Sequence, residues 1–218
     1  MHYLGQTISE DDLTKGEYVD LYLPSGLKWA TCNLGAAMPC DYGDYYMWGS
    51  VTPNTNDTCN WANAPFNNGS SSYNSEYFES VKDTVCPNGI LASEYDAAYQ
   101  ATGGEARMPT YEEFQELLGR TNNEWVTCTY LGADHATHSV MGRKFTSKED
   151  SSKCIFIPAS GGRNGSSFLD QGGSGCVWSS SLDAASPNYA RYLLFYSSIC
   201  LLPSNNRYFG FGVRPVCS

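Results

Sequence analysis

The second half of the chain is built from short apolar segments that are separated by turns rich in Gly, Ser and Asn, such as ASGGRNGSS and DQGGSG. Apolar or alternating segments bounded by such turns are typical of β-strands. No polar linker divides the 218 residues, which suffice for one sizeable core, so we expect a single domain. Strands are predicted at residues 124–131, 154–158, 176–179, 191–197 and 211–216.

A hairpin is predicted near the N-terminus, in the segment EYVDLYLPSGLKWATCNLG. Val19, Leu21 and Leu23 alternate with more polar residues, as in a half-buried strand, and the turn sequence Pro-Ser-Gly follows. The returning strand is expected at residues 28–31.

A long ordered loop is expected at residues 41–74, which are rich in Gly, Asn and Ser and show little periodicity. We expect two tryptophans to pin it, Trp48 and Trp61. A short helix is predicted beyond this loop in ASEYDAAYQATGG, with Ser93 as its cap and a Gly-Gly pair at its end. Its buried stripe would consist of Tyr95, Ala98 and Tyr99.

The strongest helix signal is the segment RMPTYEEFQELLGR. Thr110 and Glu113 form a T-x-x-E capping box at its start, and Gly119 is expected to stop it. The buried face is predicted to consist of Phe114, Leu117 and Leu118. A strand hairpin, two helices and then many short strands predict an α+β fold with an antiparallel sheet.

The net charge of −10 has the wrong sign for binding a phosphate backbone, and Lys and Arg form no cluster, so nucleic acid is not expected as a partner. No apolar run approaches the roughly 18 residues of a membrane span, so direct membrane insertion is not expected. The start MHYLGQTISEDDLTKGEY lacks the order of a signal peptide. Either the protein is not exported by that route, or a leader has been removed.

No pattern of catalytic or metal-ligating residues stands out. No helix is expected at Asp134, His135 and His138 to bring positions i and i+3 together, so a loop surface is favoured over a metal site. The WSSS segment has no nucleophile elbow and no nearby His, so a sheet edge or turn is favoured over a serine nucleophile. The nine cysteines include no C-x-x-C pair, so no structural metal is expected, whereas one or two disulfides and at least one free thiol are allowed. Neither a cofactor nor an enzymatic activity is predicted.

Four stretches, taken in order, resemble a known family. They are VDLYLPSGLKWATCNLGA, YGDYYMWG, ARMPTYEEFQELL, and VWSSS with ARYLLF and NNRYFGFGVRPV. Over residues 18–217 they are similar to proteins of gut Bacteroidales and their phages that carry the Fibrobacter major paralogous domain. RMPTYEEF and GFGVRPV are more distantly similar to the formylglycine-generating, sulfatase-modifying variant of the C-type lectin fold.

This resemblance implies a C-type lectin-like domain at residues 18–218, with two helices, twisted antiparallel sheets and adjacent terminal strands. Residues 1–17 would be an N-terminal extension. The enzymatic branch of that fold uses a closely spaced Cys pair late in the chain, whereas Cys200 and Cys217 are far apart. The calcium-dependent sugar-binding branch uses E-P-N or Q-P-D and W-N-D triplets, and none of these is present.

The resemblance therefore favours a third branch, in which the C-terminal part is the variable region of a diversity-generating retroelement. In that branch, template copies with errors at adenines overwrite the end of the gene. Here the variable region would span about residues 176–213. The fixed frame residues would be Trp178, Ser179, Ser180, Ser181, Ala190, Leu193, Phe195, Ser197, Arg207, Gly210, Val213, Arg214 and Pro215.

The genetic code offers an independent indication. Changing only the two adenines of an Asn codon cannot produce Lys, Gln, Glu, Met or Trp. None of these residue types occurs in residues 183–213, although all of them occur elsewhere in the chain.

Successive side chains of a strand face opposite sides, so Leu193 and Phe195 are expected in the core and Tyr192, Leu194 and Tyr196 outside it. Aromatic and apolar side chains mixed with Ser and Asn suit a binding surface. Residues 199–202 are predicted to be exposed, with a buried loop as the alternative. The expected ligand contacts are Tyr189, Arg191, Tyr192, Leu194, Tyr196, Ser198, Ile199, Cys200, Leu201, Leu202, Ser204, Asn205, Tyr208, Phe209 and Phe211.

The sequence thus predicts a ligand-binding protein of the receptor or adhesin type that captures a protein or glycan on a cell surface, in phage attachment or bacterial adhesion. We expect it at a cell or virion surface. Two alternatives are left open. An enzyme of the formylglycine-generating type would be favoured by a cleft with two thiols in bonding range and a bound copper or calcium ion. A surface module would use the same patch for self-assembly.

Overall fold

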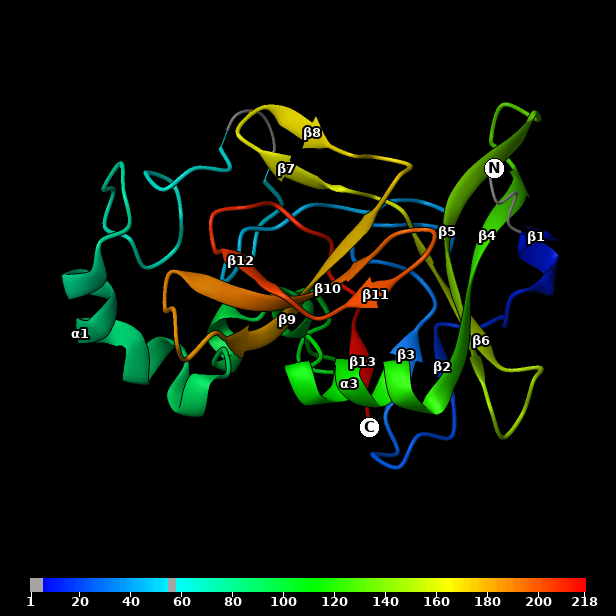
Figure 1. The fold of residues 1–218 in the computed structure, drawn as a ribbon, viewed down its shortest axis with the longest axis horizontal. Helices are drawn as coiled ribbons and strands as arrows, with labels where there is room; N and C mark the ends of the chain where they lie inside the picture. The colour runs from blue at the N-terminus through cyan, green and yellow to red at the C-terminus, as the bar shows by residue number, and fades with distance from the viewer. Residues whose placement is uncertain (1–5, 55–57) are drawn as a thin grey trace.

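The computed structural model describes residues 6–54 and 58–218. Residues 1–5 of the expected N-terminal extension and residues 55–57 of the expected loop lie outside the described residues. The described part forms three α-helices and several sheets with mostly antiparallel pairing (Figure 1), which confirms the α+β class. The helices are α1 (Ser75–Val85), α2 (Ala97–Ala101) and α3 (Tyr111–Arg120). The strands are β1 (Gln6–Ser9), β2 (Tyr18–Asp20), β3 (Lys28–Ala30), β4 (Thr121–Leu131), β5 (Thr137–Ser147), β6 (Cys154–Pro158), β7 (Gly162–Asn164), β8 (Ser167–Leu169), β9 (Gly175–Leu182), β10 (Tyr189–Phe195), β11 (Cys200–Leu201), β12 (Ser204–Asn206) and β13 (Val216–Cys217).

The long hairpin β4–β5 forms the centre of a four-stranded sheet in the order β1-β4-β5-β6. β1 pairs with β4 in parallel, with Ile8 opposite Cys128, and β6 pairs with β5 in the antiparallel sense. Part of the expected N-terminal extension is therefore a strand of this sheet, which stands at the right of Figure 1.

A second sheet carries the C-terminal segment. β10 pairs with β9 along one edge and with both β11 and β12 along the other, and every pair is antiparallel. A third, small sheet has the order β13-β3-β2, in which Val19 and Val216 both lie opposite Trp29. The predicted N-terminal hairpin is confirmed, and the last strand of the chain is paired with it.

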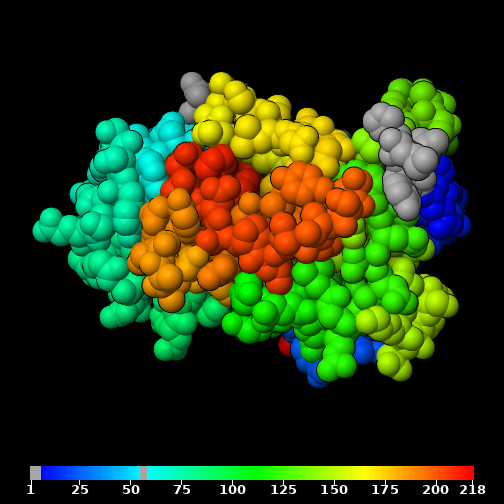
Figure 2. All heavy atoms as spheres, in the orientation of Figure 1, coloured from blue at the N-terminus to red at the C-terminus, as the bar shows by residue number. Residues whose placement is uncertain are grey.

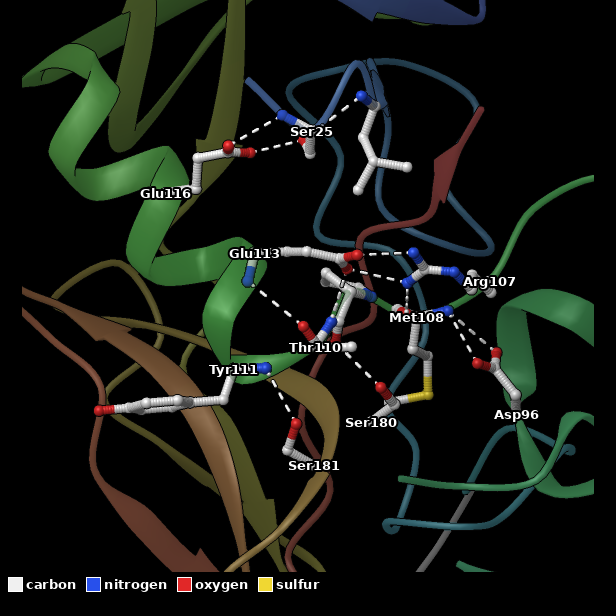
Figure 3. Close-up of polar contacts among 12 residues, drawn as sticks. Ser25, Asp96, Arg107, Met108, Thr110, Tyr111, Glu113, Glu116, Ser180 and Ser181 are labelled. Atoms are coloured by element: carbon white, nitrogen blue, oxygen red, sulfur yellow. Dashed lines mark hydrogen bonds and ion pairs between the residues drawn. The ribbon is translucent and has the colours of Figure 1, made fainter. Parts of the chain in front are cut away.

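α3 begins as the sequence predicts. The Glu113 N–H donates to Thr110 Oγ1 (3.3 Å), and the Glu113 carboxylate accepts from the Thr110 N–H (2.8 Å). Arg107 donates to both oxygens of the same carboxylate, at 2.8 and 2.6 Å (Figure 3). The helix continues one residue beyond the expected stop at Gly119, because Thr121 closes it by donating its N–H and its hydroxyl to the Leu117 carbonyl.

The predicted start of the preceding helix at Ser93 is wrong. A 3-10 turn at Ser93–Tyr95 comes first, and Asp96 caps α2. The Asp96 carboxylate accepts from the N–H of Tyr99 at 2.9 Å. It also accepts from the N–H of Met108 at 2.9 Å, as Figure 3 shows. Asp96 therefore anchors both α2 and the segment that leads into α3, which the Ser93 hydroxyl is not placed to do.

Several elements are not predicted by the sequence pattern, among them α1 and β5. α1 follows the long loop and is capped by Asn74, whose Oδ1 accepts from the Tyr77 N–H at 3.1 Å. β5 begins at the histidine-containing turn that was expected to be a loop. Conversely, the strand predicted at 211–216 is wrong in extent, because only Val216 and Cys217 form a strand there. None of the helices in the described ranges is both long enough and apolar enough to cross a membrane.

The core lies on both faces of the β9–β10 pair. Leu193 and Phe195 pack on one side with residues of the N-terminal hairpin, α3 and β5–β6. Ala190 and Tyr192 pack on the other side, against side chains from the long loop, α1 and the chain end: Tyr46, Trp48, Phe78, Phe211 and Val213. β10 is therefore covered on both faces, although Tyr189, Arg191 and Leu194 stay partly exposed.

The capping box of α3 predicts a measurable stability effect. Thr110→Ala removes the hydroxyl that accepts the Glu113 N–H, so we expect the free energy of unfolding to fall by about 1 kcal/mol in urea titrations. Gln115→Ala, at an exposed position of the same helix, is the control and should change it by less than about 0.5 kcal/mol. Equal effects of the two substitutions would show that the cap is unimportant.

Candidate binding surface

Thirteen of the expected contact residues are at least partly exposed, and we call them the C-terminal surface. Tyr196, Ile199 and Leu201 are its most exposed large apolar side chains, at 40, 45 and 42% of their full area. In Figure 2 the segment that carries these residues lies at the centre of the face, between α3 on one side and residues 160–170 on the other. The set consists of Tyr189, Arg191, Leu194, Tyr196, Ser198, Ile199, Cys200, Leu201, Leu202, Ser204, Asn205, Tyr208 and Phe209.

The exposed apolar side chains sit at the tip of the β10–β11 hairpin. Leu194 lies opposite Leu201, and the Tyr196 N–H donates to the Ile199 carbonyl at 2.9 Å. Because side chains alternate along this strand, Ile199 and Leu201 face water whereas Cys200 and Leu202 pack partly into the core. The prediction that 199–202 are exposed is thus confirmed for Ile199 and Leu201 only.

The hairpin tip is fixed from below by a buried cation. Arg143 of β5 donates to the backbone carbonyls of Tyr196 (3.1 Å) and Ser197 (3.2 Å), and to Oδ1 of Asn123 (2.6 Å). Hydrogen bonds to charged donors are stronger than neutral ones. Arg143 therefore holds the backbone of the tip through its carbonyl groups, and these hydrogen bonds do not involve the outward side chains.

A second buried cation, Arg207, holds the segment after β12. It is fully buried, and its guanidinium lies 3.9 Å from the centre of the Phe78 ring. The ring centres of Trp48, Trp61 and Tyr73 lie 5.6 to 5.8 Å from the same guanidinium carbon. Burial lowers the pKa of Arg207 to about 10, and no carboxylate in the described part of the chain pairs with it.

The hydrogen bonds of Arg207 bring distant segments together. Its Nε donates to the Pro187 carbonyl (2.9 Å) and its Nη1 to the Pro65 carbonyl (3.3 Å), while its backbone N–H donates to the Asn188 carbonyl (3.0 Å). The loop after β9, the long loop and the C-terminal segment therefore meet at one side chain. This arrangement fixes the position of Tyr208 and Phe209, whose stacked rings lie 4.8 Å apart at the edge of the surface.

Two expected contacts are wrong, because Tyr192 and Phe211 are buried at 7 and 2% exposure. The ring centres of Tyr192 and Phe211 lie 4.7 Å apart, and the ring centres of Phe211 and Trp178 lie 4.4 Å apart. Tyr192 faces away from Leu193 as alternation requires, yet the long loop and α1 form a second core on that side. Burial raises the pKa of Tyr192 to about 12.

Residues outside the expected set border the surface. The β7–β8 hairpin is joined to the C-terminal segment by backbone hydrogen bonds between Arg163 and Gly210, at 2.7 and 3.0 Å. Phe168 on this hairpin is half exposed, with the Arg163 guanidinium 4.5 Å from its ring centre. On the α3 side, Arg191 stacks over Tyr111 at 5.3 Å. The adjacent apolar pair Phe-Leu within a Gly/Ser-rich turn is the only sequence signal that points to Phe168.

The histidine and serine motifs that were considered for metal binding and catalysis form hydrogen bonds within the fold. Asp134 and His138 hydrogen bond at 2.8 Å near the tip of the β4–β5 hairpin, and this contact lowers the pKa of Asp134. Within residues 6–54 and 58–218, no three His, Cys, Asp or Glu side chains are grouped as metal ligands would be. Ser179, Ser180 and Ser181 lie in β9, which is an outer strand of its sheet because β10 is its only ladder partner within the described ranges, so the expected sheet-edge position is confirmed, although all three side chains are buried.

The hydroxyls of these three serines bind backbone groups. Ser179 Oγ donates to the Arg191 carbonyl (2.8 Å), Ser180 Oγ donates to the Pro109 carbonyl (3.3 Å), and Ser181 Oγ accepts from the Tyr111 N–H (2.9 Å). Figure 3 shows Ser180 and Ser181 against the start of α3. The WSSS segment thus links β9 to β10 and to α3.

Comparisons with models of protein families, with curated proteins and with solved structures found no match. The geometry of the site therefore carries the functional argument. It consists of apolar and aromatic side chains on a turn whose backbone is fixed from inside the protein, with Ser and Asn among them. Such a surface can bind a partner by burial of apolar area and by hydrogen bonds.

The role of Arg207 predicts a large stability effect. Arg207→Ala leaves a cavity and unpaired carbonyl groups, so we expect the free energy of unfolding to fall by roughly 3 to 5 kcal/mol. Arg120→Ala removes an exposed arginine from the end of α3 and should cost less than about 0.5 kcal/mol. Chemical denaturation of both variants measures the difference. A loss below about 1 kcal/mol for Arg207→Ala would show that another contact holds this segment.

Proposed function

We propose that this chain is a ligand-binding protein of the receptor or adhesin type, which captures a protein or glycan on a cell surface through its C-terminal surface. One observation carries the proposal. Tyr196, Ile199 and Leu201 expose large apolar area at a hairpin tip whose backbone is fixed by the buried Arg143. Exposed apolar groups of this kind mark interaction sites, and a rigid backbone reduces the entropy lost on binding.

We further propose that the fold is the C-type lectin-like fold in its formylglycine-generating variant, and that residues 176–213 are the variable region of a diversity-generating retroelement. The four sequence motifs support this assignment, together with the pairing of β13 with the N-terminal hairpin. The frame residues Leu193, Phe195 and Arg207 are fully buried, whereas the residues between them are mostly at the surface. This distribution suits a segment in which outward positions vary and inward positions do not.

The surface has the composition of a binding patch. Its centre is aliphatic and aromatic, which supplies contact area at low entropic cost in the aromatic case. Ser198, Ser204 and Asn205 add hydrogen-bonding groups, and Arg191 lies on the side towards α3. Phage attachment or bacterial adhesion at a cell or virion surface would use such a patch.

The proposal predicts that binding and folding respond to different residues. The double substitution Ile199→Ser and Leu201→Ser should leave the free energy of unfolding within about 1 kcal/mol, because both side chains face water. It should weaken binding of fluorescently labelled protein to intact Bacteroidales cells by about tenfold or more, measured by flow cytometry.

Leu131→Ser is the matched control, because Leu131 is a still more exposed leucine, at 59%, on the β4–β5 hairpin outside the C-terminal surface. It should leave cell binding unchanged. Equal binding by the double variant and the parent protein would contradict the proposed site, and a lack of parent binding across a broad panel of cells would contradict a cell-surface ligand.

Sibling genes test the proposed origin of the surface. We expect their differences to concentrate at the thirteen positions of the C-terminal surface and to spare the buried frame positions Leu193, Phe195 and Arg207. Sequencing of several copies and of the adjoining DNA measures this, and an adenine-rich near-copy of the gene end beside a reverse transcriptase should accompany them. Differences spread evenly over the chain would contradict the proposal.

A further inference from the structure

Two cysteines that are distant in the sequence meet in the core. The sulfur atoms of Cys40 and Cys128 lie 2.6 Å apart, although 88 positions separate the two residues. Both side chains are buried, at 2 and 0% exposure. Cys40 belongs to the segment after β3, and Cys128 is in the middle of β4. This contact therefore joins two parts of the chain that no β-ladder connects.

The surroundings of the pair are apolar. Ile8, Val126 and Phe156 belong to the same buried cluster. The Cys128 thiol and burial both raise the pKa of Cys40, so this thiol stays protonated in the folded protein. The Cys40 thiol lowers the pKa of Cys128, burial opposes this shift, and Lys15 makes only the smallest of the contributions that lower it. A structural role fits this environment better than a reactive one.

The remaining cysteines do not compete for this pair. Cys154 is in the same cluster, but its sulfur is directed to the Asp12 carbonyl and the Thr14 hydroxyl, at 3.9 and 3.8 Å. Cys200 is directed to Oδ1 of Asn123 at 3.7 Å. In the part of the chain that the structure describes, which includes all nine cysteines, no other two cysteine sulfurs are in contact.

We propose that Cys40 and Cys128 form a structural disulfide when the chain folds in an oxidising compartment. The oxidant is an external disulfide, either of a small thiol such as glutathione or of a thiol-disulfide oxidoreductase. One cysteine thiolate attacks the external disulfide and releases one thiol, and the second cysteine then displaces the other. Two protein thiols are oxidised to one disulfide, and one external disulfide is reduced to two thiols.

The bond has a defined place in the fold. It ties the segment after β3 to the four-stranded sheet, next to the parallel pairing of Ile8 with Cys128. Because both sulfurs are buried, the exchange takes place before this part of the core closes. The segment that carries Cys40 continues into Trp48 and Trp61, which surround Arg207 beneath the C-terminal surface. The disulfide therefore braces the support of that surface, and it does not depend on what the surface binds.

The experiment uses the full chain, refolded from denaturant in a buffer of reduced and oxidised glutathione, and then alkylated in denaturant without reduction. Double digestion with trypsin and chymotrypsin separates Cys40 from Cys32 and Cys59 before mass spectrometry. We expect one linked peptide pair that contains Cys40 and Cys128, with the other seven cysteines alkylated. Alkylation of both Cys40 and Cys128 in the refolded protein, or a link from either one to another cysteine, would overturn the proposal.

A thermal measurement provides the second readout. The bridge closes a long loop, so the oxidised protein should melt roughly 10 °C or more above the reduced protein. The double variant Cys40→Ala and Cys128→Ala should show no such redox dependence, whereas the control Cys32→Ala should retain it. Redox dependence that persists in the double variant would contradict the assignment. If the double variant fails to fold, the peptide map of the unmodified chain still decides the question.

Discussion

The burial of the Arg207 guanidinium is the interaction on which the C-terminal half of this structure depends. A cation without a carboxylate partner is costly to bury, and its compensation here comes from carbonyl groups and aromatic faces. Phe78 lies nearest, at 3.9 Å, and the carbonyls of Pro187 and Pro65 accept hydrogen bonds. The long loop and α1 therefore have a structural purpose, since they build the cage that receives this side chain.

Arg214 repeats the arrangement at the base of the same segment. It is fully buried, and it donates to Asn33 Oδ1 (2.9 Å), to the Ala30 carbonyl (3.0 Å) and to the Phe156 carbonyl (2.8 Å). Burial lowers its pKa to about 10 as well. With Arg143 below the β10–β11 tip, three cations hold the backbone of the C-terminal segment from inside. Tyr196, Ile199 and Leu201 face water, so folding constrains their identity least, which is the condition for a surface that changes its composition.

The sequence could predict those elements whose signals are local. The capping box of α3 and the alternation in the β2–β3 hairpin depend on neighbouring residues, and both are confirmed. The burial of Leu193 and Phe195 is also confirmed, because period-two alternation separates the two faces of a strand.

The features that were predicted wrongly or not at all depend on contacts between residues that are distant in the sequence. Alternation places the side chains of Tyr192 and Leu193 on opposite faces of β10. It does not reveal that a second core covers the face that carries Tyr192, and the sequence therefore predicts Tyr192 and Phe211 at the surface. The sequence does not predict α1, because SEYFESVKDTV is mostly polar and contributes only Phe78 and Val85 to the buried core. The contact from Arg143 to the carbonyl of Tyr196 spans 53 positions and has no local signal.

The most direct test of a fixed frame with free outward residues is a comparison of two libraries of this chain on a display surface. One library randomises Tyr196, Ser198, Ile199 and Leu201, and the other randomises Leu193, Phe195, Arg207 and Arg214. Resistance to protease, read by sequencing, gives the fraction of folded members in each. We predict that most members of the first library fold and that few members of the second do. Similar fractions in the two libraries would contradict the division of this segment into frame and surface.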